Sequence, residues 1–522
     1  MQKTFYITTT LPYVNADLHM GHALEFVRAD IVARQKMLEG FDVFFNTGTD
    51  EHGMKIYEKA TAAGKDPQAF VDENFLRFQE SVKIFGMTES LHFVRTTDQH
   101  HVKAAQEFWK LCDQNGYIYK KNYQSKYCVG CEAEKTDSEL NEKGECVIHP
   151  GRALEVIEEE NYFFRYSAFT EKLLALYNSR PDFVVPDFRY NEVRAFVERG
   201  LADFSISRLK EKMSWGIPVP NDPAHVMYVW FDALTNYIST LGWPHDGRKH
   251  EDLFDKYWVN GTPTQYCGKD NLRFQAAMWQ AMLLAAGVAN SYQIVINGFI
   301  TAEGGVKMSK TLGNVVDPAV IVLEYGTDAL RFFLAKEVSS FEDSPFTIER
   351  FKTAYNSGLA NGLGNLLSRT LKMGETYFGG ALELDETVSV PIVATVAGIS
   401  TDLSVENGTI PQFADTLAAT YADHMKNFDI NRATVAVWDF LTILDKYISH
   451  YEPFRIAKTD LIKTEAILAN VLYGLARAAK LLEPILPETS KTIGGHIVMT
   501  EEGGKKSFKI TPLAAPLFMR KD

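Results

Sequence analysis

Cysteine is scarce in this chain, and long apolar runs are missing. Only five cysteines occur among 522 residues, which excludes a disulfide scaffold. No apolar run approaches the roughly 20 residues of a membrane span, and the N-terminus has no basic segment followed by an apolar signal core. Internal repeats and low-complexity tracts are also missing. These absences predict a cytosolic protein without a membrane partner.

The bulk composition is that of an ordinary globular protein. Hydrophobic residues make up 46% of the chain, aromatic residues 12% and charged residues 23%, so disorder is not indicated. A chain of 522 residues is too long for one core and predicts three or four compact units. The net charge of -13 argues against a nonspecific nucleic-acid binder, although it leaves local basic surfaces open.

Strand and helix patterns alternate at the start of the chain. Residues 4–13 are apolar and β-branched, residues 22–40 have apolar positions at helical spacing, and residues 42–53 form a second strand pattern. This βαβ unit predicts an α/β fold with a doubly wound parallel sheet, whose ligands lie at the carboxyl ends of strands. Two polar segments fall at those ends, residues 19–22 and residues 50–52.

The rest of the chain falls into regions that differ in composition and in hydrophobic periodicity. The sequence becomes aromatic, cysteine-bearing and turn-rich from residue 117, apolar α/β sequence then returns, and strand signals disappear from about residue 346 to 495. Long helical periodicities in that last region predict a helical bundle. We therefore expect a first half of the sheet domain at 1–116, an insertion at 117–225, the second half at 226–298, a glycine-flanked loop region at 299–345 and a helical domain at 346–522.

The first polar segment carries His19 and His22, three residues apart. Alone, such a pair is consistent with helix-capping or surface histidines. A helix start, however, offers free N–H groups and a positive dipole end, and side chains at i and i+3 share one face. Gly21 lets a ligand lie close to the backbone. Imidazole donors there can stabilise oxygens that gain charge during nucleotidyl transfer, and one such donor is worth roughly 2.7 to 4 kcal/mol.

A second candidate site is the stretch "KMSKT" with Lys307 and Lys310. Lysine pairs are most often solvated surface features. Here Gly304, Gly305 and Gly313 supply a hinge, and two ammonium groups on a mobile loop can close over a polyphosphate and neutralise leaving pyrophosphate. Together with the histidine pair, the loop indicates attack on the α-phosphate of ATP.

A third candidate is a metal site. "CVGC" supplies Cys128 and Cys131, and "CVIH" supplies Cys146 and His149 after a fourteen-residue spacer. Three thiolates and one imidazole suit one tetrahedral Zn²⁺, and a closed set of four ligands is typical of a structural site. The alternative is a redox C-x-x-C with an unrelated cysteine and histidine.

Six stretches, in order, resemble the methionyl-tRNA synthetases among the class I aminoacyl-tRNA synthetases. They are "LPYVNADLHMGH", "GTDEHG", "SWGIPVP", "YVWFDAL", "GKDNLRF" and "KMSKTLGNVVDP". The resemblance runs from about residue 4 to 460. It implies a class I Rossmann-like parallel sheet split by a zinc-knuckle insertion, followed by an all-α anticodon-binding helical bundle.

The resemblance also implies a reaction. An enzyme of this family ligates L-methionine to initiator and elongator tRNA(Met) through methionyl-adenylate, consumes ATP with Mg²⁺, and releases AMP and diphosphate. A monomer is expected. The catalytic residues would be His19, His22, Lys307 and Lys310, and the ATP-binding residues would be His19, Gly21, His22, Gly268, Asp270, Lys307, Met308, Ser309, Lys310 and Thr311.

By the same resemblance, a methionine pocket follows. Asp50 would pair with the substrate ammonium group, and aromatic walls suit a thioether. Plain core packing is the alternative for Trp230 and Tyr237, and a buried ion pair or cap is the alternative for Asp270. The full set of residues that the resemblance implies for methionine binding is Leu11, Tyr13, Asp50, Trp230, Ala233, Tyr237, Asn271 and Gln275. The family commonly has a branched apolar residue at Asn271, a histidine at Gln275 and often proline at Leu234.

In the helical domain, Asn365 and Arg369 are four residues apart and share a helix face, where an amide and a guanidinium can read unpaired bases. They resemble the anticodon-reading pair of the family, although solvated helix residues are the alternative. Phe454 stands where the family has tryptophan. Phenylalanine keeps a stacking face for a base but lacks the indole N–H.

Two competing functions remain open. A class I synthetase for another aliphatic amino acid would need a larger editing insertion than residues 117–225 provide. A catalytically silent tRNA-binding paralogue would explain the departures, but intact His19, His22, Asp50, Lys307 and Lys310 argue against it.

Overall fold

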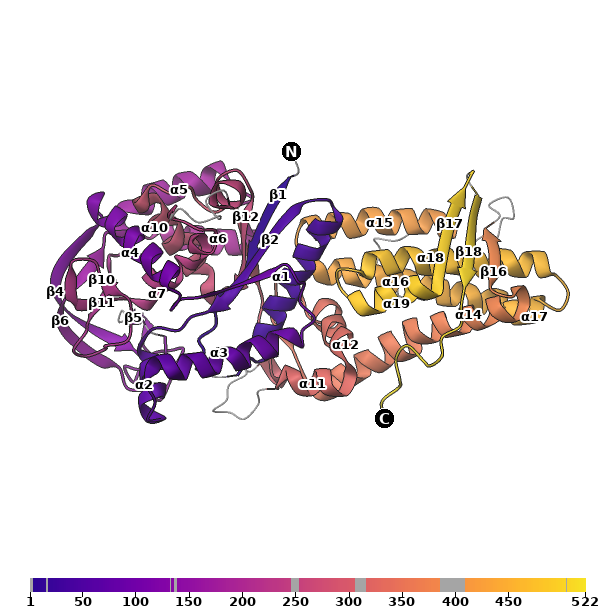
Figure 1. Cartoon of the computed structure of the whole chain (residues 1–522), viewed down its shortest axis with the longest axis horizontal. Coiled ribbons are helices and arrows are strands. Elements are labelled where there is room, and N and C mark those ends of the chain that lie inside the picture. The colour runs from indigo at the N-terminus through magenta and orange to yellow at the C-terminus, as the bar shows by residue number, and fades with distance from the viewer. Residues whose placement is uncertain are drawn as a thin grey trace. The chain divides into compact units, whose positions relative to one another are not determined.

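The computed structural model describes residues 3–15, 17–131, 133–135, 139–245, 253–305, 316–384, 409–503 and 505–522 (Figure 1). The chain forms two compact units. The first contains residues 1–18, 36–83 and 87–297, and the second contains residues 19–35, 84–86 and 298–522. Among the residues described, none of the helices is both long and apolar enough to cross a membrane.

A six-stranded sheet forms the centre of the first unit, with the strand order β3-β2-β1-β12-β13-β7. All neighbouring strands in it are parallel. The βαβ start and the parallel sheet predicted from the sequence are therefore confirmed. The strands are β1 (Thr4–Thr8), β2 (Asp42–Thr49), β3 (Leu91–Arg95), β7 (Val184–Val185), β12 (Pro263–Gly268) and β13 (Gln293–Asn297).

Helices of the first unit cover this sheet with apolar faces. In α4 (Gln99–Gln114) the buried positions fall at 101, 104, 105, 108, 109 and 112, which is the spacing of one helix face. Phe108 on that face stacks on Trp279 of α10 (Trp279–Ala286), with ring centroids 5.5 Å apart. The remaining helices are α2 (Met54–Ala62), α3 (Pro67–Lys83), α5 (Thr170–Ser179), α6 (Asp187–Glu198), α7 (Val229–Ala233) and α8 (Asn236–Ser239).

Residues 117–225 contain two small antiparallel sheets and one strand of the main sheet. The first has the order β5-β4-β6-β8 and the second has the order β10-β11-β9, whereas β7 pairs with β13 of the main sheet. The strands are β4 (Ile118–Cys128), β5 (Ala133–Lys135), β6 (Glu155–Phe164), β8 (Phe204–Ser205), β9 (Ser207–Leu209), β10 (Pro218–Val219) and β11 (Asp222–Met227). The long pair β4–β6 carries the candidate metal ligands at one end.

The second unit is mainly helical, as the sequence predicts. It includes most of α1 (Met20–Leu38), and the helices α15, α16 and α18 pack against one another (Figure 1). Its other helices are α11 (Pro318–Tyr325), α12 (Thr327–Phe332), α13 (Ile348–Ala354), α14 (Asn365–Phe378), α15 (Ile410–Lys426), α16 (Ile430–Tyr451), α17 (Pro453–Ile456), α18 (Leu461–Leu482) and α19 (Pro487–His496).

One expectation for this region is wrong. Strand signals were expected to be missing from 346 to 495, yet β16 (Ala381–Leu384) pairs with β18 (Lys505–Ile510), which also pairs with β17 (Ile497–Glu502). The strand β16 buries Leu382 and Leu384 and exposes Ala381 and Glu383. Four residues of alternation are too short to stand out beside the long helical periodicities of the neighbouring helices.

Buried arginines fix α1 within the second unit. Asp30 of α1 lies 2.7 Å from the Arg331 guanidinium of α12, and both side chains are fully buried. Arg331 also donates to the carbonyls of Pro484 and Ile485. Arg28 donates to four carbonyls between residues 334 and 340. Because these charges are satisfied by several partners, they set the position of the helix whose first turn carries the histidine pair.

Candidate active site and metal centre

The histidine pair lies at the N-terminal end of α1, as the sequence predicts. His19 precedes the helix and His22 lies in its first turn. The two imidazole rings are stacked, with centroids 3.8 Å apart and planes 18° apart. A Cβ added at Gly21 would lie 2.9 Å from Cε1 of His19. The glycine therefore makes room for the His19 ring, a role that the sequence analysis did not identify.

Backbone hydrogen bonds orient both imidazoles. The N–H of His19 donates to Nδ1 of His22 over 3.2 Å, and the N–H of Gly21 donates to Nδ1 of His19 over 3.1 Å. In these two hydrogen bonds Nδ1 of each ring is the acceptor, which makes Nε2 the ring nitrogen that carries the proton. The pair therefore presents two Nε2–H donors at a positive helix end, which suits an anionic ligand.

In the first unit, Asp50 and Tyr13 are neighbours across a parallel β-bridge that extends the main sheet. The N–H of Asp50 donates to the Pro12 carbonyl, and the N–H of Val14 donates to the Asp50 carbonyl. Two of the predicted methionine-binding residues are therefore brought together at the carboxyl ends of β1 and β2. Asp50 is only 4% exposed, so its charge lies in a site of reduced dielectric.

The two residues after Asp50 are anchored to different elements. Glu51 accepts a forked pair of hydrogen bonds from Arg95, at 2.8 and 3.0 Å, and its carbonyl accepts from the indole N–H of Trp215. His52 donates from Nδ1 to Asp232 of α7 over 2.7 Å. The segment that carries Asp50 is thus fixed to β3, to the "SWGIPVP" stretch and to α7.

Asp232 is a buried carboxylate that two histidines hold. His101 of α4 donates from Nε2 to Asp232 over 2.8 Å, beside the bond from His52. Burial alone would raise the pKa of Asp232, but the two imidazoles outweigh it and lower this pKa below the usual value. Sequence reasoning missed Asp232 and His101, because 131 residues separate them in the chain.

Trp230 of α7 is half-buried and lies flat on Phe274, with centroids 3.8 Å apart and planes 3° apart. Its indole nitrogen has no hydrogen-bond partner among the described residues. Ala233 lies on the same short helix and is buried, and Leu11 is half-buried. Trp230 thus packs against the core of the first unit with its indole nitrogen buried, and its role as the wall of a pocket stays a prediction.

Tyr237 and Gln275 are in direct contact. Nε2 of Gln275 donates to the Tyr237 hydroxyl over 2.6 Å, and both residues are almost fully buried. The Gln275 side-chain oxygen accepts from Gln265 over 2.7 Å. Asn271, in contrast, is half-buried and donates to Asp270 over 3.2 Å. Of the residues that depart from the family pattern, Asn271 and Gln275 therefore have different surroundings, and of these two only Gln275 is fully buried.

Only some of the residues predicted to bind the nucleotide belong to the described part of the chain. Gly268 ends β12 and is buried, and Asp270 lies on the short 3-10 turn that follows, exposed to solvent. An exposed Asp270 does not fit the alternative of a buried ion pair. The predicted loop residues Lys307, Met308, Ser309, Lys310 and Thr311 lie outside the described residues.

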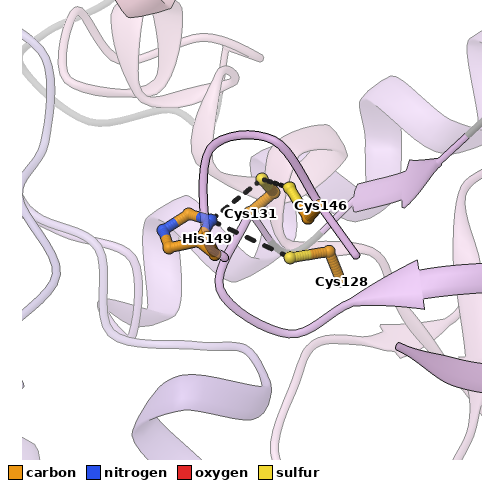
Figure 2. Close-up of side chains that lie close together, drawn as sticks. All are labelled: Cys128, Cys131, Cys146 and His149. Carbon is orange, nitrogen blue, oxygen red and sulfur yellow. Dashed lines mark hydrogen bonds between the residues drawn. The ribbon is translucent and has the colours of Figure 1, made fainter. Parts of the chain in front are cut away.

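The four predicted metal ligands converge at the end of the β4–β6 pair, as Figure 2 shows. Sγ of Cys131 lies 3.5 Å from Sγ of Cys146 and 3.2 Å from Nδ1 of His149, and Sγ of Cys128 lies 3.8 Å from that nitrogen. Tetrahedral zinc with bonds of about 2.0 to 2.3 Å sets its ligand atoms roughly 3.3 to 3.8 Å apart. The three distances are close to this spacing, and all four ligand atoms lie within 4.8 Å of one another, as the ligands of one ion must.

Backbone hydrogen bonds and a glycine position the four ligands of this metal site. The N–H of Cys131 donates to the Cys128 carbonyl, and the N–H of His149 donates to the Cys146 carbonyl, so each ligand pair closes a tight turn. A Cβ at Gly130 would lie 2.6 Å from Cγ of His149, and only glycine leaves space for that ring. All three thiols are free, and a disulfide would need sulfurs about 2.05 Å apart. The cluster thus suits one structural metal ion.

The predicted base-reading residues lie in the second unit. Asn365 is exposed at the start of α14, and Arg369 follows one turn later on the same face. Arg369 donates to the Asp445 carboxylate of α16 over 2.7 Å. Phe454 is 49% exposed on α17. Asp445 was missed because nothing in its local sequence marks it as the partner of Arg369.

Known proteins match the chain along nearly its whole length. A family model described as tRNA synthetases class I (M) matches residues 5–371. The methionine–tRNA ligase of Thermotoga maritima is 37% identical over 505 residues, which cover 96% of this chain and 76% of the relative. The methionine–tRNA ligase of Nostoc sp. is 39% identical over 494 residues, which cover 94% of this chain and 89% of the relative.

Among solved structures, that of Mycobacterium tuberculosis methionyl-tRNA synthetase in complex with methionyl-adenylate is similar, with a TM-score of 0.84 at 36% identity. The match covers 94% of this chain and 93% of that one. The apo form of the same synthetase has a TM-score of 0.80. With these matches, the chain belongs to the methionine–tRNA ligase family of the class I tRNA synthetases.

Proposed function

We propose that the protein joins L-methionine to initiator and elongator tRNA(Met) in two steps. A methionine carboxylate oxygen attacks the α-phosphorus of ATP, the bond to the bridging oxygen breaks, and pyrophosphate leaves. A hydroxyl of the terminal tRNA ribose then attacks the methionyl carbonyl, and AMP leaves. The observation that carries the proposal is the likeness, over 94% of the chain, to a synthetase whose structure holds methionyl-adenylate.

In this proposal, His19 and His22 stabilise charge on the α-phosphate. Their Nε2–H groups are oriented by backbone bonds to Nδ1, so no reorganisation is needed when the phosphate gains charge. Lys307 and Lys310 neutralise the triphosphate, with Gly21, Gly268, Met308, Ser309 and Thr311 close to the nucleotide and Asp270 at the ribose. Mg²⁺ accompanies ATP and, when bound, offsets part of the phosphate charge.

In this proposal, the methionine site is built from residues of the first unit. Asp50 pairs with the substrate ammonium group, and the hydrogen bonds of Glu51 and His52 hold its segment in place. Leu11, Tyr13, Trp230, Ala233, Tyr237, Asn271 and Gln275 form the rest of the proposed pocket. The nearly buried carboxyl group of Asp50 favours a cationic ligand, and the flat face of Trp230 favours an unbranched apolar side chain.

The knuckle holds one Zn²⁺ through Cys128, Cys131, Cys146 and His149. Four protein ligands leave no open coordination position, so the role of the ion is to hold the end of the β4–β6 pair together. In the second unit, Asn365, Arg369 and Phe454 read the anticodon. The protein acts as a monomer in the cytoplasm.

Aminoacylation tests the proposal. The protein is incubated with ATP, Mg²⁺, methionine and transcripts of initiator or elongator tRNA(Met), and with a transcript whose anticodon is changed. Charging of both tRNA(Met) species and a large loss with the changed anticodon are expected. Charging that does not depend on the anticodon would overturn the roles of Asn365, Arg369 and Phe454.

A lysine variant separates catalysis from binding. Lys310→Ala is expected to abolish adenylate formation and to leave tRNA binding nearly unchanged. A silent tRNA-binding paralogue would instead form no adenylate before the substitution. Equal adenylate formation in Lys310→Ala and the unaltered chain would remove the role assigned to Lys310.

A further inference from the structure

Lys135 lies close to the metal centre, on the strand that follows its first two ligands. β5 pairs with β4 so that Ala133 lies opposite Cys128 and Lys135 lies opposite Lys126. Paired residues of neighbouring strands share a face of the sheet, and so do alternate residues of one strand. The side chains of Lys135 and Cys128 therefore lie on the same face of this strand pair.

The Lys135 side chain is almost fully buried. Only 7% of it is exposed, and lysine is rarely buried to this extent without a partner. Its ammonium group donates a hydrogen bond to the Cys131 sulfur and forms an ion pair with Glu139, with Nζ and Oε1 3.5 Å apart. One of these two partners of the buried cation is thus a predicted metal ligand.

Glu139, the other partner, lies beside the second pair of ligands. The N–H of Val147 donates to the Glu139 carbonyl over 3.3 Å, and Leu140 forms an antiparallel bridge with Cys146. The Glu139 side chain is 39% exposed, so water screens its charge more than it screens that of Lys135. Lys135 therefore contacts the first ligand turn directly and the second through Glu139.

The charge of the ligand set explains why a cation belongs at this place. Zn²⁺ held by three thiolates and one neutral imidazole leaves one net negative charge. Cys128 and Cys146 are buried, so this charge would lie where water screens it poorly. One ammonium group within hydrogen-bond reach brings the total charge to zero.

We propose that Lys135 is the counter-charge of the metal centre, which offsets the excess negative charge of the three thiolates and thereby raises the affinity for Zn²⁺. This inference rests on the proposed zinc site. Lys135 is not itself a ligand, because a protonated amine has no lone pair to give. Groups that bond to metal ligands from outside the coordination sphere typically change metal affinity about 10- to 100-fold.

Glu139 separates this role from that of a plain ion pair. If Lys135 served only to pair with Glu139, removal of either charge would break the same pair and would weaken the site in the same direction. A counter-charge predicts opposite signs. Loss of the Lys135 cation leaves negative charge in excess, whereas loss of the Glu139 carboxylate removes negative charge from the surroundings of the thiolates.

The test measures the dissociation constant of zinc on the purified full chain, by competition with a chromophoric chelator. Lys135→Gln should raise this constant about 10- to 100-fold, and Lys135→Arg, which keeps the charge, should restore most of the affinity. The matched control is Lys126→Gln, which removes the same charge from the exposed position directly opposite and should leave the constant unchanged. An unchanged constant in Lys135→Gln would overturn the inference.

Glu139→Gln tests the sign of the effect. It alters a more exposed side chain and therefore carries the test if Lys135→Gln does not fold. The dissociation constant of zinc should fall about 1.5- to fivefold, the range of a partly screened charge. A rise of the constant in Glu139→Gln would show that only the ion pair matters and would overturn the inference.

The outcomes separate this inference from the proposed zinc site. An unaltered protein that binds no zinc would contradict the proposed site before Lys135 is tested. One tightly bound zinc per chain, with the same dissociation constant in Lys135→Gln, would contradict the role of Lys135 alone.

Discussion

The imidazole rings of His19 and His22 are stacked 3.8 Å apart, and backbone N–H groups donate to the Nδ1 atom of each. In the proposed reaction, the Nε2–H groups of both rings donate to the α-phosphate as it gains charge. His22→Ala should therefore lower the rate of methionine-dependent pyrophosphate exchange about 100- to 1,000-fold, since a single donor of this type is worth roughly 2.7 to 4 kcal/mol.

The control for this prediction is His450→Ala, which removes an exposed histidine of α16. It should leave the exchange rate unchanged. A loss of less than about threefold in His22→Ala, with the fold intact, would contradict an electrostatic role for the pair.

The metal centre predicts one zinc ion per chain. Cys131→Ser replaces a thiolate ligand by a poor one, so metal analysis of the purified protein should find well under one zinc per chain. Because the proposed ion would hold the end of the β4–β6 pair, protease cleavage between residues 128 and 149 should become faster. Cys112→Ala removes a buried thiol outside the cluster and should keep a full zinc content. Full zinc in both variants would contradict the ligand assignment.

The Asp232 carboxylate predicts a dependence of stability on pH. Its pKa lies below the usual 3.8 in the folded protein, despite burial, because His52 and His101 donate to it. The folded state therefore binds this proton less tightly than the unfolded state. The stabilisation is fully present above about pH 4 and is lost as the pH falls through the folded pKa. The urea concentration at the midpoint of unfolding should therefore fall as the pH is lowered through this range.

Asp232→Asn isolates this contribution. The substitution should lower the urea midpoint at pH 7, and the difference from the unaltered chain should shrink as the pH falls below about 4. Asp113→Asn, on an exposed position of α4, should leave the midpoint at pH 7 unchanged. A difference that grows in acid would contradict the assigned hydrogen bonds.

If Arg369 reads the anticodon, its substitution should lower tRNA charging and leave adenylate formation unchanged. Arg369→Ala removes a guanidinium that Asp445 holds in place, and an Arg–base contact is worth about 1 to 3 kcal/mol, or roughly 5- to 150-fold. kcat/KM for tRNA(Met) should fall within that range, whereas pyrophosphate exchange without tRNA should not change. Arg432→Ala, an exposed arginine of α16, is the matched control. Loss of both activities in Arg369→Ala would point to misfolding instead.

Local patterns predicted the fold well where a periodicity was long. The βαβ start, the parallel sheet and the helical second unit all follow from segments whose apolar spacing extends over many residues. The strand β16 was missed because it has only four residues. "MYVWFDAL" also reads as a buried strand, but β11 ends at Met227 and the helix α7 begins at Val229, because the following residues pack on α4.

The candidate site was predictable only where its residues are close in sequence. The spacing of His19 and His22, and of the four metal ligands, indicated their convergence directly. Contacts between residues far apart in the sequence gave no such signal, as the contact of His101 with Asp232 across 131 positions shows. These contacts depend on how strands and helices are placed by the core, which no local pattern encodes.

Activation of methionine is the step on which the proposed function depends. It can be measured by ATP–pyrophosphate exchange with the purified protein and, separately, methionine, leucine, isoleucine, valine and norleucine. We expect rapid exchange with methionine, weaker exchange with norleucine and little with the three branched amino acids. Exchange with leucine, isoleucine or valine and none with methionine would contradict it.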